Sequence, residues 1–249
     1  MKDNNNITIY DQNWTEWLDL QLYGPKHRWL RHILFECLKQ LDDEGIHSIL
    51  DVGCGEGTIT YFTAKHFTDA RVAGIDISQV GISCAQQRWN EPNLHFFHDE
   101  TLKRLKDNYD LICCFEVLEH VQDWQGLLDR FSASALKYIA LSFPVGKMRP
   151  FETSVGHLRN FQEGEVESYL SQKGFLPENI FYAGYPFYSP IYRELCDAFN
   201  VPGSNFARGK YGLPQRIVSQ FFYLLFRFCS TKKKFGEQFC GVFRKDSSR

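Results

Sequence analysis

The stretch that decides the fold of this chain is Ser48-Ile49-Leu50-Asp51-Val52-Gly53-Cys54-Gly55-Glu56-Gly57-Thr58. A short apolar run enters three glycines at alternate positions, and a helix-like segment follows. Glycine suits such a tight turn because it tolerates positive φ and lets a ligand approach the backbone. The pattern therefore predicts a strand, a glycine turn and a helix N-terminus. The unpaired N–H groups of that helix end can meet a carboxylate, a ribose or a phosphate.

The spacing of the glycines separates two kinds of nucleotide-binding turn. The dinucleotide fingerprint needs two more residues before its third glycine, so Gly53-x-Gly55-x-Gly57 departs from it. Asp76 lies at the end of the next strand-like run, 19 residues after Gly57. A carboxylate at that distance, at the carboxyl end of a strand, can accept hydrogen bonds from both ribose hydroxyls. The glycine turn alone would also fit an ordinary strand–helix connection, and Asp76 favours the ligand-binding interpretation.

A second informative stretch covers residues 110–121, where an apolar strand pattern ends in Glu116-Val117-Leu118-Glu119-His120-Val121. Ligands of open α/β sheets bind at the carboxyl ends of the strands. Together with the glycine turn, this run resembles the class I, Rossmann-like S-adenosylmethionine-dependent methyltransferases. It looks most like the small-molecule enzymes of the ubiquinone-biosynthesis type. The resemblance spans about residues 46–145, and its motifs are specific for the cofactor and weak for the substrate.

The resemblance implies that S-adenosylmethionine is the cofactor. Asp99 would accept the adenine amine, since a carboxylate is an acceptor for that donor. Asp51 would either face the ammonium group of the cofactor or hold the glycine turn. Phe115 and Glu116 would line the methionine part. The predicted cofactor-binding residues are Asp51, Gly53, Cys54, Gly55, Asp76, Ile77, Asp99, Phe115 and Glu116.

The loop at 145–160 is expected to hang over the carboxyl edge of the sheet. Gly156-His157-Leu158-Arg159-Asn160-Phe161 resembles Gly-His-x-Arg-x-Phe loops of the same enzyme group. His157 is the first candidate for a general base, because neutral imidazole is available near pH 7. His120 is the second catalytic candidate. Arg159 could bind an anionic group of the acceptor. Both histidines could instead anchor the backbone, and Arg159 could be solvated. Tyr23 and Tyr188 complete the predicted acceptor site.

Alternation of apolar runs with helical patterns predicts an α/β fold, a doubly wound, mostly parallel sheet. Five strands are expected at 48–53, 72–77, 94–98, 110–117 and 137–144. The family resemblance implies seven strands, with an antiparallel pair at 179–184 and 237–244 and the last strand inserted between its neighbours. The expected organisation is an N-terminal helical segment over the cofactor mouth (1–45), a core (46–184 and 236–249), and a helical, aromatic insertion forming a cap (185–235).

Composition limits the function further. The chain has 249 residues and a net charge of −2, so no global basic field predicts nucleic-acid binding. Eight cysteines occur without a Cys-x-x-Cys pair, which favours reduced thiols and a cytoplasmic protein. The N-terminus has no apolar run typical of a signal peptide. No His-x-x-x-His or carboxylate triad predicts a catalytic metal.

The apolar segment 217–228, followed by Lys232, Lys233 and Lys234, allows three interpretations. It could be a buried helix, a substrate lid, or a contact with a membrane surface through 217–234. The predicted reaction is methyl transfer to a small molecule, in the first place a hydroxyl of a sugar or secondary metabolite. A non-catalytic cofactor-binding subunit and a quinone or isoprenoid acceptor at a membrane surface are the alternatives. The glycine spacing argues against an oxidoreductase. The oligomeric state is not defined by the sequence.

Overall fold

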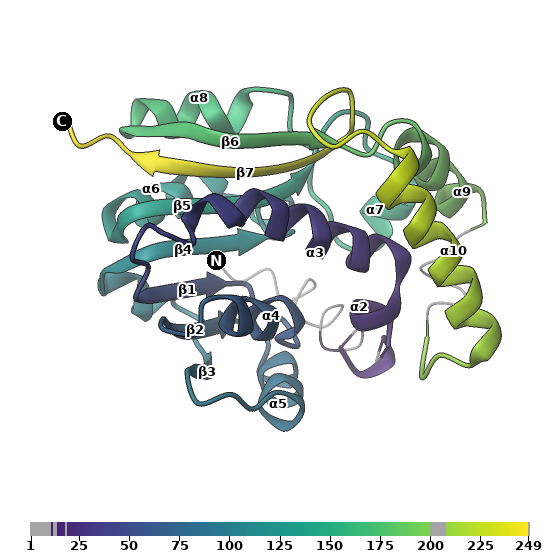
Figure 1. The fold of residues 1–249 in the computed structure, drawn as a ribbon, viewed down its shortest axis with the longest axis horizontal. Helices are drawn as coiled ribbons and strands as arrows, with labels where there is room; N and C mark the ends of the chain where they lie inside the picture. Colours follow the sequence, from purple (N-terminus) through teal and green to yellow (C-terminus); the bar gives the residue numbers. More distant parts are fainter. Residues whose placement is uncertain (1–10, 12–13, 18, 200–207, 249) are drawn as a thin grey trace.

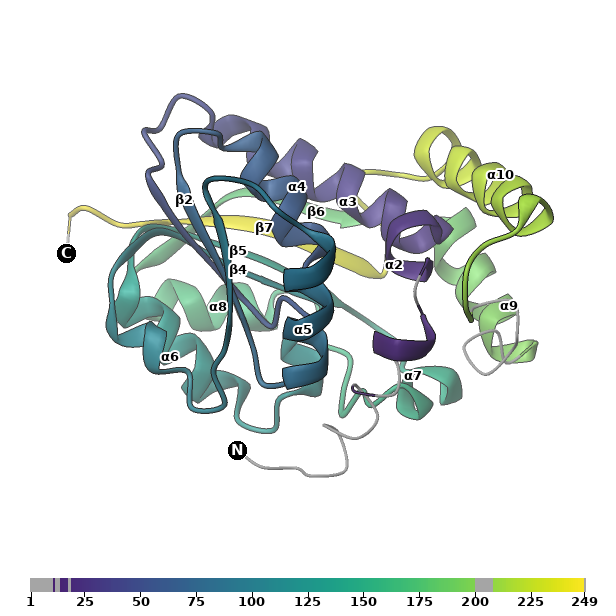
Figure 2. The ribbon, with the colours of Figure 1, turned by 90° about the horizontal axis from the view of Figure 1, so that it is seen from below.

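A computed structural model describes residues 11, 14–17, 19–199 and 208–248 of the chain. A central sheet is covered on both faces by helices (Figures 1 and 2). The sheet has seven strands in the order β3-β2-β1-β4-β5-β7-β6. The strands are β1 (Ser48–Val52), β2 (Arg71–Asp76), β3 (Leu94–His98), β4 (Tyr109–Phe115), β5 (Ala135–Pro144), β6 (Phe175–Ala183) and β7 (Gln238–Lys245).

β1 to β5 are parallel, and β7 is antiparallel to both of its neighbours, β5 and β6. The strand order reverses between β1 and β4, and such a switch point is where open α/β sheets bind ligands. The predicted fold class is therefore confirmed, including the last strand between its neighbours. The main difference from the sequence-based expectation is that β6 begins at Phe175, because its first residues are largely exposed and lack an apolar pattern.

The helices and short helical turns follow the strands in the doubly wound pattern. The α-helices are α2 (Leu20–Tyr23), α3 (Pro25–Leu38), α4 (Thr58–His66), α5 (Gln79–Arg88), α6 (Trp124–Ser134), α7 (Pro150–Ser154), α8 (Glu165–Gln172), α9 (Arg193–Ala198) and α10 (Leu213–Cys229). The shorter turns are η1 (Lys39–Leu41), η2 (Lys103–Lys106), η3 (Leu118–His120) and the π-type turn η4 (Phe187–Tyr192).

Side chains at alternate positions of each central strand pack into two separate cores, one on each face of the sheet. Ile49 belongs to the cluster under α3, α4 and α5, and Leu50 belongs to the cluster under α6 and α8. α3 forms because Pro25 opens it and its apolar residues recur on one face, with Trp29, Leu30 and Ile33 all about 1% exposed. Two covered faces explain why the central strands are apolar throughout.

The segment between β6 and β7 carries η4, α9 and α10, and α10 packs against α3 at one end of the molecule (Figure 1). Phe226 of α10 is fully buried against Trp29 and Tyr188. None of the helices in the described part of the chain has the length and apolar character to span a bilayer. All eight cysteines are free thiols, and five of them are buried.

Candidate functional site

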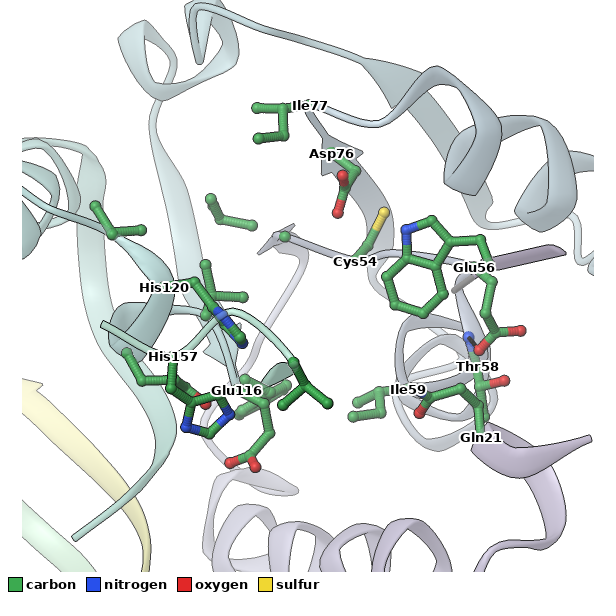
Figure 3. Close-up of a pocket in the computed structure, with 18 of the residues that line it drawn as sticks. Gln21, Cys54, Glu56, Thr58, Ile59, Asp76, Ile77, Glu116, His120 and His157 are labelled. Atoms are coloured by element: carbon green, nitrogen blue, oxygen red, sulfur yellow. Dashed lines mark hydrogen bonds between the residues drawn. The ribbon is translucent and has the colours of Figure 1, made fainter. Parts of the chain in front are cut away.

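A cavity of about 520 Å³ opens at the carboxyl ends of β1, β2 and β4. Its wall combines the glycine turn, the ends of these strands, the loop at 155–158 and the start of α3. Trp14 and Trp17, from the segment before α2, close the remaining side. Two groups of polar side chains face each other across the cavity in Figure 3, one around Asp76 and one around His157.

The glycine turn is built as the sequence predicts. Gly53, Gly55 and Gly57 all have positive φ, between 55° and 80°. A Cβ on Gly57 would lie 2.6 Å from the ring of Phe96, and a Cβ on Gly55 would lie 2.6 Å from the ring of Trp14. Close packing as well as backbone conformation therefore requires glycine here. Gly57 then caps α4, and the first N–H of that helix, from Thr58, donates to the Glu56 carboxylate at 3.1 Å.

Asp76 is tied to the glycine turn. Its carboxylate accepts the backbone N–H of Gly55 at 2.8 Å and the N–H of Ser78 at 2.7 Å. The side chain lines the cavity and is only 9% exposed, and this burial raises its pKa. Each carboxylate oxygen has two lone pairs, so Asp76 keeps acceptor capacity for a hydroxyl pair.

Glu116 marks the opposite side of the cavity. It is a non-glycine residue with a φ of 57°, so the chain turns sharply at the end of β4. Its carboxylate accepts hydrogen bonds from Lys26 at 2.8 Å, Ser142 at 3.0 Å and Gln238 at 2.8 Å. Although burial opposes ionisation, Lys26 and the hydrogen bonds lower the pKa of Glu116 to about 2. The ion pair also raises the pKa of Lys26, so both groups are charged at neutral pH.

The wall of the cavity contains buried polar atoms with no hydrogen-bond partner in the described structure. They are the indole N–H of Trp14, the hydroxyl of Thr58 and both carboxylate oxygens of Glu119. Buried polar groups in native proteins are almost always paired. Their concentration in one cavity indicates that a polar ligand completes the site.

Residues 23–146 match the family model described as a methyltransferase domain. This chain belongs to the class I S-adenosylmethionine-dependent methyltransferases. It is 26% identical over 218 residues to a malonyl-[acyl-carrier protein] O-methyltransferase of Acetivibrio thermocellus, covering 86% of this chain and 72% of that protein.

A ubiquinone biosynthesis O-methyltransferase of Coxiella burnetii is 34% identical over 99 residues, which is 38% of this chain and 41% of that enzyme. Among solved structures, the magnesium protoporphyrin IX methyltransferase of Synechocystis PCC 6803 with bound SAH aligns with a TM-score of 0.55 at 17% identity. That alignment covers 89% of this chain and 86% of the other, and it shows a shared fold.

The residues of this methyltransferase fit its cofactor. The acceptor capacity of Asp76, the glycine turn and the unpaired polar atoms offer the donors and acceptors that a ribose and an amino acid group need. The predicted cofactor residues that line the cavity are Gly53, Cys54, Asp76, Ile77, Phe115 and Glu116. Their individual contacts remain predictions.

Three predicted cofactor residues are not part of the cavity wall as described. Asp51 is buried and accepts a hydrogen bond from the Thr60 hydroxyl at 2.6 Å, and burial raises its pKa to about 7. Asp51 thus connects β1 to α4, which flank the glycine turn, and its role toward the cofactor stays a prediction. Asp99 accepts the N–H of Arg104 at 3.0 Å and stabilises the turn that carries Leu102 into the wall. Gly55 lies beneath Trp14.

At the far side of the cavity, His120 and His157 stand edge to face with ring centroids 4.7 Å apart. His120 Nδ1 lies 2.9 Å from the carbonyl of Gly156, and His157 Nδ1 lies 3.5 Å from Asn160 Oδ1. Burial lowers the pKa of both histidines, that of His157 to about 3. Both imidazoles are therefore neutral at working pH.

Glu119 completes this cluster and is fully buried, with its pKa raised first by burial and then by the charge of Glu116. One ligand atom each from Glu119, His120 and His157 lie within 4.8 Å of one another. Two imidazoles and a carboxylate could hold a transition-metal ion. Sequence spacing predicted no metal, because His157 lies 37 positions beyond His120 and the fold brings them together.

The three predicted acceptor residues lie outside the described wall of the cavity, and their contacts with an acceptor stay predictions. Arg159 donates to the carbonyls of Val121, at 2.8 Å, and Gln122. Tyr188 packs on Trp29 in the core at a centroid distance of 4.5 Å. Tyr23 lies beneath the guanidinium of Arg216. Arginine and tyrosine at these positions support the loops around the site.

Sequence reasoning missed several residues that shape the site. Lys26 and His27 reach the cavity from the first turn of α3, and Glu119 stands at its buried side. Proline followed by polar residues at a helix start was the only local signal for Lys26. A second missed feature is the two buried arginines Arg149 and Arg193. They connect the loop after β5 to α9 and to Glu237, which directly precedes β7.

Proposed function

We propose that this methyltransferase transfers the methyl group to a hydroxyl oxygen of an uncharged small molecule, such as a sugar or a secondary metabolite. The observation that carries the proposal is the neutral pair of His120 and His157 in the cavity wall. A hydroxyl must lose its proton when it is methylated, and neutral imidazole is the commonest acceptor for that proton. Bound S-adenosylmethionine would supply an electrophilic methyl group on its sulfonium.

The charges of the wall favour an acceptor without a negative charge. Lys26 is the one Lys or Arg among the described residues that line the cavity, and its charge is neutralised by Glu116. Of the other acids in the wall, Glu56 is already paired with Arg88 at 3.1 Å and Glu119 has a raised pKa, so the wall offers an anion no unpaired cation. An acceptor carboxylate or phosphate would therefore be buried unpaired, which is unfavourable. A hydroxyl compound avoids this penalty.

His157 would serve as the base through Nε2. Its Nδ1 faces Asn160 Oδ1, an arrangement that favours the proton on Nδ1 and leaves the lone pair on Nε2. With the cofactor bound, in-line attack by the hydroxyl oxygen on the methyl carbon would release the sulfur as a neutral thioether and leave positive charge on the oxygen. The resulting oxonium is a strong acid, so even an imidazole of lowered pKa can take its proton. Positioning by the cavity supplies the larger part of the catalysis.

The experiment is a labelled-methyl transfer assay on a panel of acceptors of matched size: a glycoside or phenol, a primary amine, and a malonyl thioester. We expect product only with the hydroxyl compounds. Transfer to the malonyl carboxylate instead would overturn the proposal, and it would agree with the substrate in the name of the Acetivibrio relative. Transfer to the amine alone would equally refute it.

The role of His157 is tested on the best acceptor with His157→Gln and, as a control, His95→Gln on the exposed side of β3. We expect kcat to fall about 100-fold for His157→Gln alone, with cofactor affinity unchanged. Treatment with EDTA should leave wild-type kcat intact. A loss of activity that Mn²⁺ restores would assign Glu119, His120 and His157 to a metal instead.

A further inference from the structure

A continuous exposed apolar surface lies on α10. Its outer face carries five apolar residues at helical spacing: Leu213, Ile217, Phe221, Leu224 and Phe228. Phe221 is 62% exposed and Phe228 is 70% exposed. We call these five residues the α10 stripe. Large aromatic side chains on one continuous face usually mark an interaction surface.

The α10 stripe is not a face that the protein's own core covers. The opposite face of α10 already packs on α3, where Phe226 is fully buried. Arg28 of α3 also donates to Gln220 at 2.8 Å and stacks on Tyr223 at 4.0 Å. α10 is therefore fixed on the molecule by one face while the stripe points outward. In Figure 1, α10 forms the outer edge of the molecule.

The charges around the stripe all have one sign. Residues 213–236 contain two arginines and three lysines and no acidic residue, although the whole chain carries a net charge of −2. Lys232, Lys233 and Lys234 follow α10 directly and are exposed. Among the described residues, none of these three lysines is in an ion pair with a carboxylate. Glu36 of α3 interacts electrostatically with Lys232 but is itself paired with Lys39 at 2.6 Å. The surface thus combines exposed aromatics with a net positive charge.

An apolar groove of about 240 Å³ adjoins the stripe, between α10, α9 and the start of α3. Val218 and Phe222 of α10 line it together with Leu195 and Phe199, and Phe199 is 73% exposed. Pro25 closes its end, directly before Lys26 of the main cavity. The apolar surface is therefore wider than a single helix face.

We propose that the α10 stripe and Lys232–Lys234 dock this protein onto the surface of an anionic lipid bilayer. An amphipathic helix with aromatic and aliphatic residues on one side and basic residues beside it binds in the plane of the interface. Aromatic side chains enter the acyl boundary, and the lysines lie near anionic headgroups. A second protein copy would instead need acidic groups opposite the lysines, which the stripe itself does not carry.

The test is flotation with vesicles of phosphatidylcholine alone and with added phosphatidylglycerol, using the full chain. We expect binding to the anionic vesicles and little to the neutral ones, with loss at high salt. Phe221→Ser/Phe228→Ser should weaken binding at least about tenfold. The matched control is Leu136→Ser/Leu176→Ser, two residues that are each 50% exposed on β5 and β6. The control should bind as wild type.

The charge contribution is tested with Lys232→Gln/Lys234→Gln against Lys103→Gln/Lys106→Gln, which removes the same charge from exposed positions on η2. We expect about 30-fold weaker binding for the first pair only. Circular dichroism checks that each variant is folded. Absence of binding to anionic vesicles by folded wild type overturns the proposal. So does an equal loss in both members of a matched pair. Self-association in sedimentation that Phe221→Ser/Phe228→Ser abolishes would assign the stripe to a second copy.

Discussion

The two sides of the cavity are held in place in different ways. The side around Asp76 is built by backbone: Gly53 and Cys54 donate to the carbonyl of Ile75, and Gly55 donates to Asp76. The side around His157 is held by side chains that come from distant parts of the chain. Arg193 pairs with Glu152, 41 positions earlier, and Asn160 connects Glu152 to His157.

This difference explains why one side of the cavity can be located from sequence alone and the other cannot. A strand, a glycine turn and an acid at the end of the next strand are local patterns, and hydrogen bonds between neighbouring strands fix their geometry. A loop held by buried ion pairs has no local pattern, because its partners are set by tertiary contacts. We therefore expect substitutions on the two sides to lower the free energy of unfolding for different reasons. On the His157 side the loss comes from broken ion pairs, and on the Asp76 side it comes from backbone strain and overpacking.

The largest effect is expected from breaking the ion pairs. Arg193 is 2% exposed, pairs with Glu152 and donates to Glu237 at 2.6 Å. Arg193→Met leaves Glu152, 3% exposed, without its cation, which typically costs about 3–5 kcal/mol. Urea unfolding should show this loss. Arg244→Met, which breaks the exposed pair with Glu178, should cost at most about 1 kcal/mol. Equal losses would mean that the buried network does not hold the loop.

The second prediction distinguishes the cost of backbone strain from the cost of overpacking in the glycine turn beside Asp76. Gly57 and Gly164 have nearly the same conformation, with φ of 80° and 82°, and each caps a helix. A Cβ on Gly57 meets Phe96 at 2.6 Å, and a Cβ on Gly164 meets nothing within 4 Å. Gly164→Ala should cost about 1 kcal/mol from strain, and Gly57→Ala about 3 kcal/mol because overpacking adds to it. Denaturant midpoints measure both, and similar midpoints would show that Phe96 can move aside.

The site residues show which parts of this contrast were predictable. The turn glycines and Asp76 came from local spacing, and their geometry is as expected. The sequence indicates His120 and His157 as separate catalytic candidates. No local pattern predicts that their ring centroids lie 4.7 Å apart. Tyr188 is a predicted acceptor residue, and that role stays a prediction. The structure shows its ring packed on Trp29, because a buried aromatic side chain also stabilises a core.

Cofactor affinity provides the third comparison. Asp76 and Asp110 are each 9% exposed, and each accepts two backbone N–H groups. Asp76 alone lines the cavity. Calorimetric titration of Asp76→Asn with S-adenosylmethionine should give about 100-fold weaker binding, because two charge-assisted bonds to the ribose are weakened. Asp110→Asn should bind as wild type. A comparable loss in Asp110→Asn would trace the effect to general destabilisation.

The effect that is smallest at neutral pH concerns His27, which reaches the cavity from α3. Burial, Lys26 and Arg31 lower its pKa to about 3, against the opposing influence of Glu116. Between pH 6.5 and 3 the unfolded chain therefore binds a proton at His27 that the folded chain does not, so this residue lowers stability as the pH falls. His27→Gln removes that penalty. Relative to wild type, the variant should gain about 1.4 kcal/mol per pH unit from pH 6 to pH 4 and nothing above pH 7.5. Urea unfolding across this range checks it, with the exposed His95→Gln as control. Parallel stability curves for His27→Gln and wild type would mean that His27 is solvated in the folded protein, and that the start of α3 is not part of a closed cavity wall.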